Sequence, residues 1–323
     1  MTGVTFNMKK YLLLFVTICF FCAALVAQEE DAFEAPDKPF QNHVMTALGF
    51  QAVQLEENDF VFTPSVNLQY MCTKSKGVES KLPDMIAIGA GYSQNIFTTG
   101  LGPDNVKKMQ SVNLMASLSK GKNIFTSMVS SYGEERISDI SMILWQFTHQ
   151  LIQTDSFSFL IGGGLFVVNL ESEFFVLPLP AFSFSYTNDY FYGEISMMGL
   201  NVVLLPKSMF RFNGSLGMGG FSSVRDIAFD CALAYYPLFN AENEGIRELL
   251  CVSAGIMNQS AGFKLQDKTS FGYQCYTVYG EVNATFISLR CGYNFDGKML
   301  VDNEIKKDMY KGMFATVQAM FMF

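Results

Sequence analysis

The sequence predicts an all-β fold, a single antiparallel up-and-down β-barrel that crosses a membrane with its strands. Three observations lead to this prediction: hydrophobic and small or polar residues alternate along most of the chain, the composition is very apolar, and no internal segment suits a membrane-spanning helix. Of the 323 residues, 50% are hydrophobic and only 16% are charged, whereas about 25% are charged in average globular domains. One domain is sufficient at this length, because barrels of this size form single units.

Residues 1–27 have the layout of an export signal. Lys9 and Lys10 precede an apolar run that ends at Ala27, and acidic residues follow at once. A basic segment, an apolar segment and a small residue at the cleavage point make up a secretory signal peptide. Cleavage after Ala24 is an alternative to cleavage after Ala27. We expect a signal peptide at 1–27, a short periplasmic leader at 28–40 and the barrel at 41–323.

The chain beyond residue 27 contains no segment that could cross a bilayer as a helix. Its longest mostly apolar stretch, Ile195–Pro206, is interrupted by Asn201 and falls short of the roughly 20 apolar residues that a spanning helix needs. In hydrocarbon, only helices and closed barrels satisfy all their backbone polar groups. A membrane role must therefore be carried by strands.

Alternation with a period of two is the main evidence for strands. In each such segment one face is apolar and the other consists mainly of small or polar side chains. The segments are about 10 to 14 residues long, which suits a tilted membrane crossing. The clearest are 60–70, 111–119, 143–150, 210–218 and 226–235.

Turn residues separate these segments at short intervals. Tight turns are expected at 56–59, 120–123, 154–155 and 187–189, and longer connections near 73–83, 98–109, 238–248, 259–269 and 296–309. A bacterial single-chain barrel has an even number of strands. The sequence predicts about 14, with 12 or 16 as alternatives.

A soluble β-sandwich shows the same alternation, with its apolar face turned inward. Its exterior would be charged, whereas the less apolar face here is rich in Gly, Ser, Ala, Asn and Gln. Aromatic residues also gather near expected strand ends, at 186–192 and 235–236, as in the aromatic girdles of membrane barrels. Both observations favour lipid on the outside.

The last eleven residues, 313–323, form an alternating strand that ends in phenylalanine. Here the sequence resembles the bacterial outer-membrane β-barrel superfamily, whose last strand ends in this way and is read by the barrel-assembly machinery. The resemblance implies location in the bacterial outer membrane, with its lipid and that machinery as partners, and an assembly signal at Phe321 and Phe323. A weaker similarity to MipA/OmpV-type barrels lies in 174–192, where Leu177-Pro178-Leu179-Pro180 precedes an aromatic hairpin; no function is taken from it.

Charge and cysteine usage exclude several classes of function. The net charge is −8, and binding to nucleic acid would need clustered Lys and Arg. Five cysteines follow the signal, at 72, 231, 251, 275 and 291, without a Cys-X-X-Cys motif, so no zinc or redox site is expected. We expect no cofactor and no metal.

The sequence also lacks a recognisable catalytic site. Only His43 and His149 are present as histidines, and no serine follows His149 closely, as a lipid hydrolase of the barrel type would require. An interfacial position suits His149 better. Gly162-Gly163-Gly164 lacks the Lys-Ser or Lys-Thr of a phosphate-binding loop and indicates close packing or a kink in the wall. An outer-membrane lipid-modifying enzyme is therefore the least favoured function.

The leading hypothesis is a passive channel or transporter for small solutes, because about 14 strands enclose more space than side chains fill. Side chains expected in the lumen are Glu194, Arg211, Asp226, Asp230 and Arg290. The alternative is a structural, adhesive or envelope-scaffold barrel with a filled lumen. Oligomeric state and substrate do not follow from the residues.

One hairpin can be given a register. A turn at Val282–Ala284 would place Cys275 opposite Cys291 and Tyr276 opposite Arg290. Because directly opposed Cβ atoms lie about 4.5–5.5 Å apart, this register predicts two neighbouring free thiols on the lipid side. The same register pairs Phe271 with Phe295 and Tyr273 with Tyr293.

Overall fold

The computed structural model describes residues 40–57, 59–74, 83–101, 106–133, 139–170, 173–197, 199–218, 227–239, 249–264, 270–301, 304–308 and 311–322. The expected signal peptide and nearly all of the leader lie outside these ranges. So do Asp226 and Phe323.

Within these ranges seventeen strands form one antiparallel sheet. They are β1 (Phe40–Glu56), β2 (Asp59–Lys74), β3 (Met85–Leu101), β4 (Val106–Lys120), β5 (Asn123–Gly133), β6 (Asp139–Gln153), β7 (Phe157–Leu170), β8 (Glu173–Thr187), β9 (Phe191–Ser196), β10 (Gly199–Leu204), β11 (Phe210–Met218), β12 (Ile227–Tyr235), β13 (Leu250–Lys264), β14 (Ser270–Ala284), β15 (Ile287–Val301), β16 (Glu304–Asp308) and β17 (Met313–Met322).

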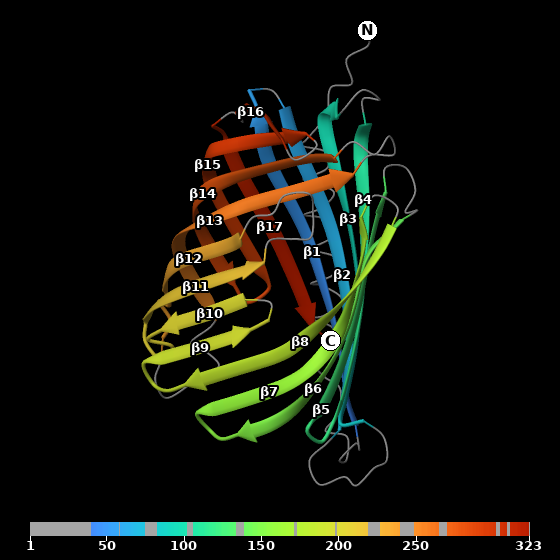
Figure 1. Cartoon of the computed structure of the whole chain (residues 1–323). Helices are drawn as coiled ribbons and strands as arrows, with labels where there is room; N and C mark the ends of the chain where they lie inside the picture. The colour runs from blue at the N-terminus through green and yellow to red at the C-terminus, as the bar shows by residue number, and fades with distance from the viewer. Residues whose placement is uncertain are drawn as a thin grey trace.

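The sheet closes on itself, because β1 pairs with both β2 and β17 (Figure 1). The last wall position is shared by two strands: β16 pairs with 298–301 of β15, and β17 pairs with 287–293 of the same strand. The described strands thus occupy sixteen positions around an up-and-down barrel. The fold class is confirmed, and the strand number is the larger alternative rather than the expected fourteen.

The alternation places the apolar face outside. Exposed large hydrophobic side chains occur on nearly every strand, including Leu68, Leu114, Trp145, Phe147, Leu216 and Leu233, the last of which is 68% exposed. A β-sandwich would bury this face, so the sandwich alternative is wrong. None of the described residues forms a helix that is long and apolar enough to cross a membrane.

The inner face carries a hydrophobic cluster that bridges the lumen. Phe97 of β3 and Phe271 of β14 meet edge to face, with ring centroids 6.4 Å apart. The cluster lies at the distal end of the barrel, which we define as the end opposite the pairing of Met45 with Met322. In Figure 1 the ends of β13 and β14 reach the upper ends of β1–β4 there. The buried members are Val53, Leu55, Val61, Phe97, Met109, Ala232, Met257, Phe271, Tyr273, Cys275, Tyr279 and Phe314.

The glycines of β7 lie where two strands approach closely. A Cβ atom on Gly162 would collide with the carbonyl oxygen of Phe147, and one on Gly164 with that of Trp145. Only glycine fits such an approach. The close packing expected from this tripeptide is confirmed.

The expected hairpin at 282–284 is wrong. Ala284 pairs with Ile287, so the turn consists of Thr285 and Phe286, and Gly280 rather than Cys275 lies opposite Cys291. The register therefore shifts by an odd number of residues relative to the expected one. An odd shift moves each partner to the other face of the sheet. The buried Cys275 is only 2% exposed within the inner cluster, whereas Cys291 is exposed. The other proposed pairs of this register are equally wrong.

Candidate functional site

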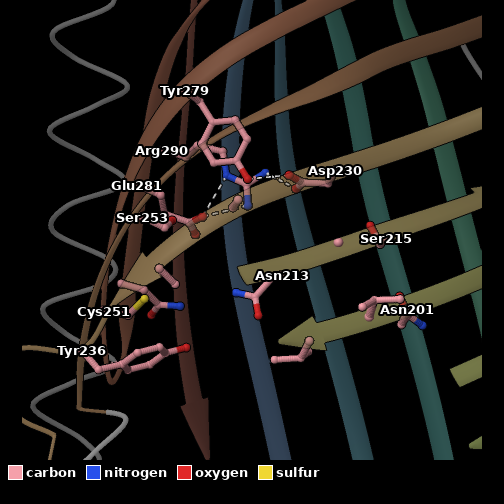
Figure 2. A pocket seen from close by; sticks show the side chains of 16 residues that line it. Asn201, Asn213, Ser215, Asp230, Tyr236, Cys251, Ser253, Tyr279, Glu281 and Arg290 are labelled. Carbon is pink, nitrogen blue, oxygen red and sulfur yellow. Dashed lines mark hydrogen bonds and ion pairs between the residues drawn. The ribbon is translucent and has the colours of Figure 1, made fainter. Parts of the chain in front are cut away.

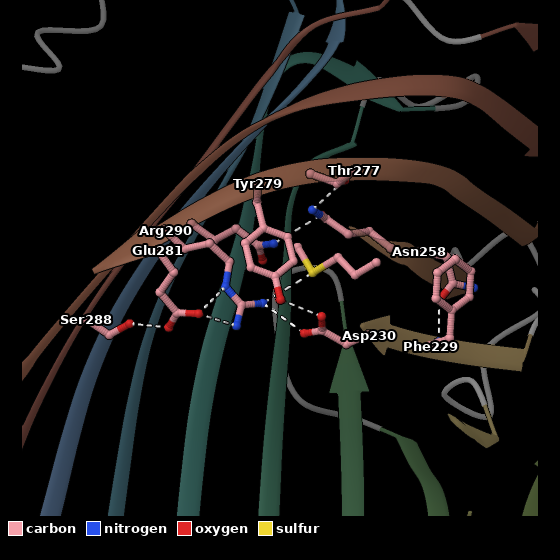
Figure 3. A network of polar contacts seen from close by, with 11 residues as sticks. Phe229, Asp230, Asn258, Thr277, Tyr279, Glu281, Ser288 and Arg290 are labelled. Atoms are coloured by element: carbon pink, nitrogen blue, oxygen red, sulfur yellow. Dashed lines mark hydrogen bonds and ion pairs between the residues drawn. The ribbon is translucent and has the colours of Figure 1, made fainter. Parts of the chain in front are cut away.

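Three charged side chains meet on the inner face of the barrel wall. Asp230 comes from β12, Glu281 from β14 and Arg290 from β15 (Figure 3). Glu281 and Arg290 are directly paired residues, so their side chains share one face of the sheet. The register of β12, β13 and β14 places Asp230 on that same face, in line with Met257 and Thr277.

Arg290 is the centre of this group. Its Nη2 and Nε atoms both donate to Oε2 of Glu281, at 2.8 and 3.1 Å. Its Nη1 atom donates to Oδ2 of Asp230 at 3.3 Å and contacts the Met257 sulfur at 3.2 Å. The guanidinium carbon lies 4.3 Å from the centre of the Tyr279 ring, within the range of a cation–π interaction.

The two carboxylates have further donors. The Tyr279 hydroxyl donates to Oδ1 of Asp230 at 2.5 Å, and the Ser288 hydroxyl donates to Oε1 of Glu281 at 2.7 Å. Every carboxylate oxygen of the group therefore accepts at least one hydrogen bond. A polar network that is satisfied in this way is rigid and holds its charges in place.

The group carries a net negative charge, since two carboxylates face one guanidinium. Its side chains remain partly accessible, at 34% for Asp230, 16% for Glu281 and 26% for Arg290. They border an inner cavity of about 340 Å³ (Figure 2) whose other polar lining includes Asn201, Asn213, Ser215, Tyr236, Cys251, Ser253 and Asn283. The arrangement presents an excess of hydrogen-bond acceptors and negative charge to the lumen.

A second polar chain crosses the lumen beside the hydrophobic cluster. Nε2 of Gln51 on β1 donates to Oε1 of Gln259 on β13 at 3.3 Å, and Nε2 of Gln259 donates to the Thr277 hydroxyl at 3.0 Å. The Thr277 hydroxyl in turn donates to Oδ1 of the buried Asn294 at 2.7 Å. Together with the aromatic contact of Phe97 and Phe271, this chain links strands that are not neighbours in the wall.

The structure brings Asp230 and Arg290 together but leaves two other expected lumen residues elsewhere on the same wall. Glu194 accepts hydrogen bonds from the Ser183 hydroxyl at 3.2 Å and the Tyr192 hydroxyl at 2.8 Å. The Arg211 guanidinium lies 4.0 Å above the ring of Tyr236. Asp226 lies outside the described residues.

Glu281 and Tyr279 were missed by the sequence analysis. The signal was present, because Tyr279, Glu281 and Asn283 alternate with Val278, Gly280 and Val282. The misplaced turn at 282–284 hid it, since that register put Tyr276 rather than Glu281 beside Arg290.

No catalytic or metal-binding constellation appears in the part of the chain that is described. No three His, Cys, Asp or Glu side chains gather there in a way that could hold a metal ion. His149 pairs with Asn123 near one end of β6, and its Nδ1 atom lies 2.8 Å from Oδ1 of Asn123.

No protein-family model matches the sequence, and no curated protein is similar to it. The solved structures with some likeness include OccAB3 of Acinetobacter baumannii, with 8% identity over 88% of this chain and 99% of that chain and a TM-score of 0.27. A BenF-like porin from Pseudomonas fluorescens Pf-5 has 8% identity over 88% and 99%, with a TM-score of 0.29. The translocator domain of the autotransporter NalP from Neisseria meningitidis has 10% identity over 95% and 98%, with a TM-score of 0.25.

Proposed function

We propose that this chain is an outer-membrane β-barrel that conducts small polar solutes and prefers cations. The observation that carries the proposal is the inner cavity with its Asp230, Glu281 and Arg290 group, which has a net charge of −1. Fixed charge on a lumen wall sets the ion preference of a pore.

The outer surface supports a membrane position. Large apolar side chains exposed on this scale need lipid or a partner to cover them, and here they surround a closed ring of strands. Exposed aromatic rings also gather at the proximal end, where Phe210 and Tyr235 stack with centroids 4.9 Å apart. Tyr186 and Tyr190 are exposed at the β8–β9 connection of the same end. Such rings suit the boundary between hydrocarbon and water.

Barrel size supports conduction. Eight strands are just filled by side chains, and barrels of sixteen strands leave an aqueous channel. The contact of Phe97 with Phe271 narrows the lumen at the distal end. We therefore expect a smaller conductance than an unobstructed barrel of sixteen strands would have.

Planar-bilayer recording of the purified protein tests this function. A KCl gradient should give discrete conductance steps and a reversal potential displaced toward that of K⁺. A folded sample, verified by heat-modifiable migration in gels, that remains electrically silent would overturn the proposal.

A second candidate is a structural barrel with a blocked lumen. The bridge formed by Phe97–Phe271 and Gln51–Gln259 favours it, because these side chains link strands that are not neighbours in the wall. In this case the wild type would be silent, whereas variants in which the bridge is removed would conduct.

A further inference from the structure

The wall of the barrel has a step between β8 and β9. β8 spans Glu173–Thr187, but only its residues from Ser183 onward pair with β9. The neighbouring hairpin turns early, since Ser196 of β9 pairs with Gly199 of β10. In the described part of the chain, no strand pairs with residues 173–181 on the β9 side of β8.

The short hairpin cannot cross a bilayer. β9 and β10 have 6 residues each. At about 3.3 Å per residue this gives roughly 20 Å along the strand, and the tilt of barrel strands reduces it further, against an apolar band roughly 25 Å tall. The wall at β9 and β10 therefore stops within the membrane, and the distal half of β8 forms one side of a lateral notch.

The unpaired edge of β8 contains residues that hinder the addition of another strand. The backbone oxygen of Phe182 accepts from the nitrogen of Met197, on the β9 side. Because alternate residues direct their backbone groups to the same side of a strand, Pro178 and Pro180 direct theirs toward the notch. Proline has no N–H and prevents a further strand from adding to the edge. What the edge offers is carbonyl oxygens, which need hydrogen-bond donors.

Apolar surface lies on both sides of this edge. The three successive residues Phe175, Val176 and Leu177 are 45%, 58% and 47% exposed. Leu177 pairs with Phe166 of β7, and Phe166 pairs with Leu144 of β6. The side chains of Phe166 and Leu144 are buried together with Met142 in a second hydrophobic cluster on the inner face. Phe175 and Leu177 are therefore exposed on the lumen side of the wall, and Val176 on the lipid side.

The proximal border of the notch, formed by the distal ends of β9–β12, carries both polar and apolar side chains. A cavity of about 340 Å³ lies over the distal ends of β9–β12 and is lined by residues of both wall faces, among them Ser196, Leu216 and Asp230. Leu216 is an outer residue, whereas Asp230 belongs to the inner charged group. This cavity thus connects the outer surface of the barrel with the acidic site of the lumen.

We propose that the notch is a lateral portal through which an amphiphile of the surrounding leaflet enters the lumen. Its apolar tail lies against Phe175 and Leu177. Its head, rich in hydroxyl or ammonium donors, is held by the free carbonyl groups of β8 and by the acidic group around Asp230. Two observations select this ligand class: the edge has acceptors without matching donors at its prolines, and the cavity border has a net negative charge.

Quenching of tryptophan by bromine tests the portal directly, because the chain has one tryptophan, Trp145. In a Trp145→Phe background we would compare Leu177→Trp with Asn113→Trp in vesicles of phosphatidylcholine brominated on its acyl chains. Asn113 faces the same lumen from β4, where the wall is continuous on both sides. We expect at least half the quenching of native Trp145 for the tryptophan at 177 and little for the one at 113. Phe175→Trp is the substitute if Leu177→Trp does not fold.

The outcomes separate this proposal from the proposed function, on whose membrane placement it rests. Absence of quenching of native Trp145 would remove the membrane placement itself. Quenching of Trp145 with no excess at position 177 over position 113 would leave the barrel in the membrane and overturn the portal.

The head-group class is tested in unbrominated lipid with two probes of equal chain length, a bromine-tailed alkylammonium and a bromine-tailed alkyl carboxylate. The ammonium should quench the tryptophan at 177 at roughly tenfold lower concentration, the factor that corresponds to 1.4 kcal/mol. An equal or reversed preference would overturn the assigned head group.

Discussion

Phe97 and Phe271 touch across the lumen, one from β3 and the other from β14, with their ring planes at 84°. They are 3% and 5% exposed, so the contact is fully enclosed by the distal cluster. A barrel interior that is polar on most strands is thus bridged at one end by two rings from strands that are not neighbours in the wall.

Removing this bridge should widen the pore. Phe271→Ala should raise the single-channel conductance and lower the free energy of unfolding by about 3–5 kcal/mol, the usual cost of deleting a buried phenylalanine side chain. Conductance and urea unfolding in vesicles measure the two effects. Phe184→Ala is the matched control, because Phe184 packs on Phe157 at the outer surface; equal conductance of both variants would show that the bridge does not limit the pore.

Ion preference should follow the charge of the inner group. Glu281→Gln removes one of two carboxylates and should reduce the displacement of the reversal potential toward K⁺, whereas Arg290→Gln should increase it, since the lumen charge becomes more negative. Asp189→Asn is the control, because its ion pair with Lys207 is exposed and lies in a turn between strands. Shifts of the same sign for the two lumen variants would contradict an electrostatic role.

Outer and inner positions should differ in their tolerance of charge. Leu114→Lys places an ammonium on the exposed outer face in the middle of β4 and should cost about 2–4 kcal/mol, the range for mid-membrane depth. Ser215→Lys points into the inner cavity, where Asp230 is its directly paired neighbour, and should cost less. Folding yields in lipid vesicles measure the difference, and equal losses would place lipid on both faces or on neither.

The terminal phenylalanine should matter for insertion. Deletion of Phe323 or its replacement by Ser should lower the amount of barrel in the outer membrane, because the resemblance to outer-membrane barrels makes this residue part of an assembly signal. The conductance of the molecules that do insert should not change. The amount of barrel is measured by cell fractionation, with Met322→Leu as the control. A normal yield of the Phe323 variants would refute the assignment.

A polar clasp at the proximal end should weaken in acid. Asp84 forms an ion pair with Lys74 at the end of β2 and accepts a hydrogen bond from the backbone N–H of Gly121 at 2.6 Å. The hydrogen bond with Lys74, followed by that with Gly121, lowers the pKa of Asp84 below its ordinary value of 3.8. A lowered pKa stabilises the folded state above the ordinary value, and this contribution is lost as the pH falls through the folded value.

Asp84→Asn tests the clasp. It should reduce stability at neutral pH and should flatten the decline in stability below about pH 4, the usual range of an aspartate. Urea unfolding at several pH values measures this, with Asp189→Asn as the control. Identical pH profiles of the wild type and Asp84→Asn would show that the clasp contributes nothing.

Much of the fold could be predicted from the sequence, because its strands carry their information in a period of two. Where turns contain Gly, Asn or Asp, as at 120–123 and 187–189, the strand ends were also found. The turns at Thr285–Phe286 and after Ser196 lack such residues at their centres. A turn closed by tertiary pairing rather than by turn residues leaves no local signal. This is why one register was wrong and why fourteen strands were preferred to the alternative of sixteen.

The candidate site was only partly predicted, because its contacts also depend on strand register. Asp230 and Arg290 are charges within otherwise apolar strands and therefore stand out. Their contact depends on the register of four strands, β12 to β15. Asp296 has a left-handed backbone conformation, with φ of 47°, and lies at the register shift opposite residues 274–276. The spacing of residues in the sequence does not predict a β-bulge of this kind. The step in the wall depends on the length of the β9–β10 hairpin. The alternation of apolar and polar residues does not indicate that length either.

The pairing of β1 with β17 also constrains how the molecule can form. Hairpins such as β4–β5 require only local loop closure, whereas the seam joins segments that are far apart in the sequence and closes the longest loop of any strand pair in the barrel. Closure is therefore expected late, and until then the growing sheet has two open edges that could pair with another chain. A chain of this design needs protection against self-association during its transit, up to the moment when its final strand arrives.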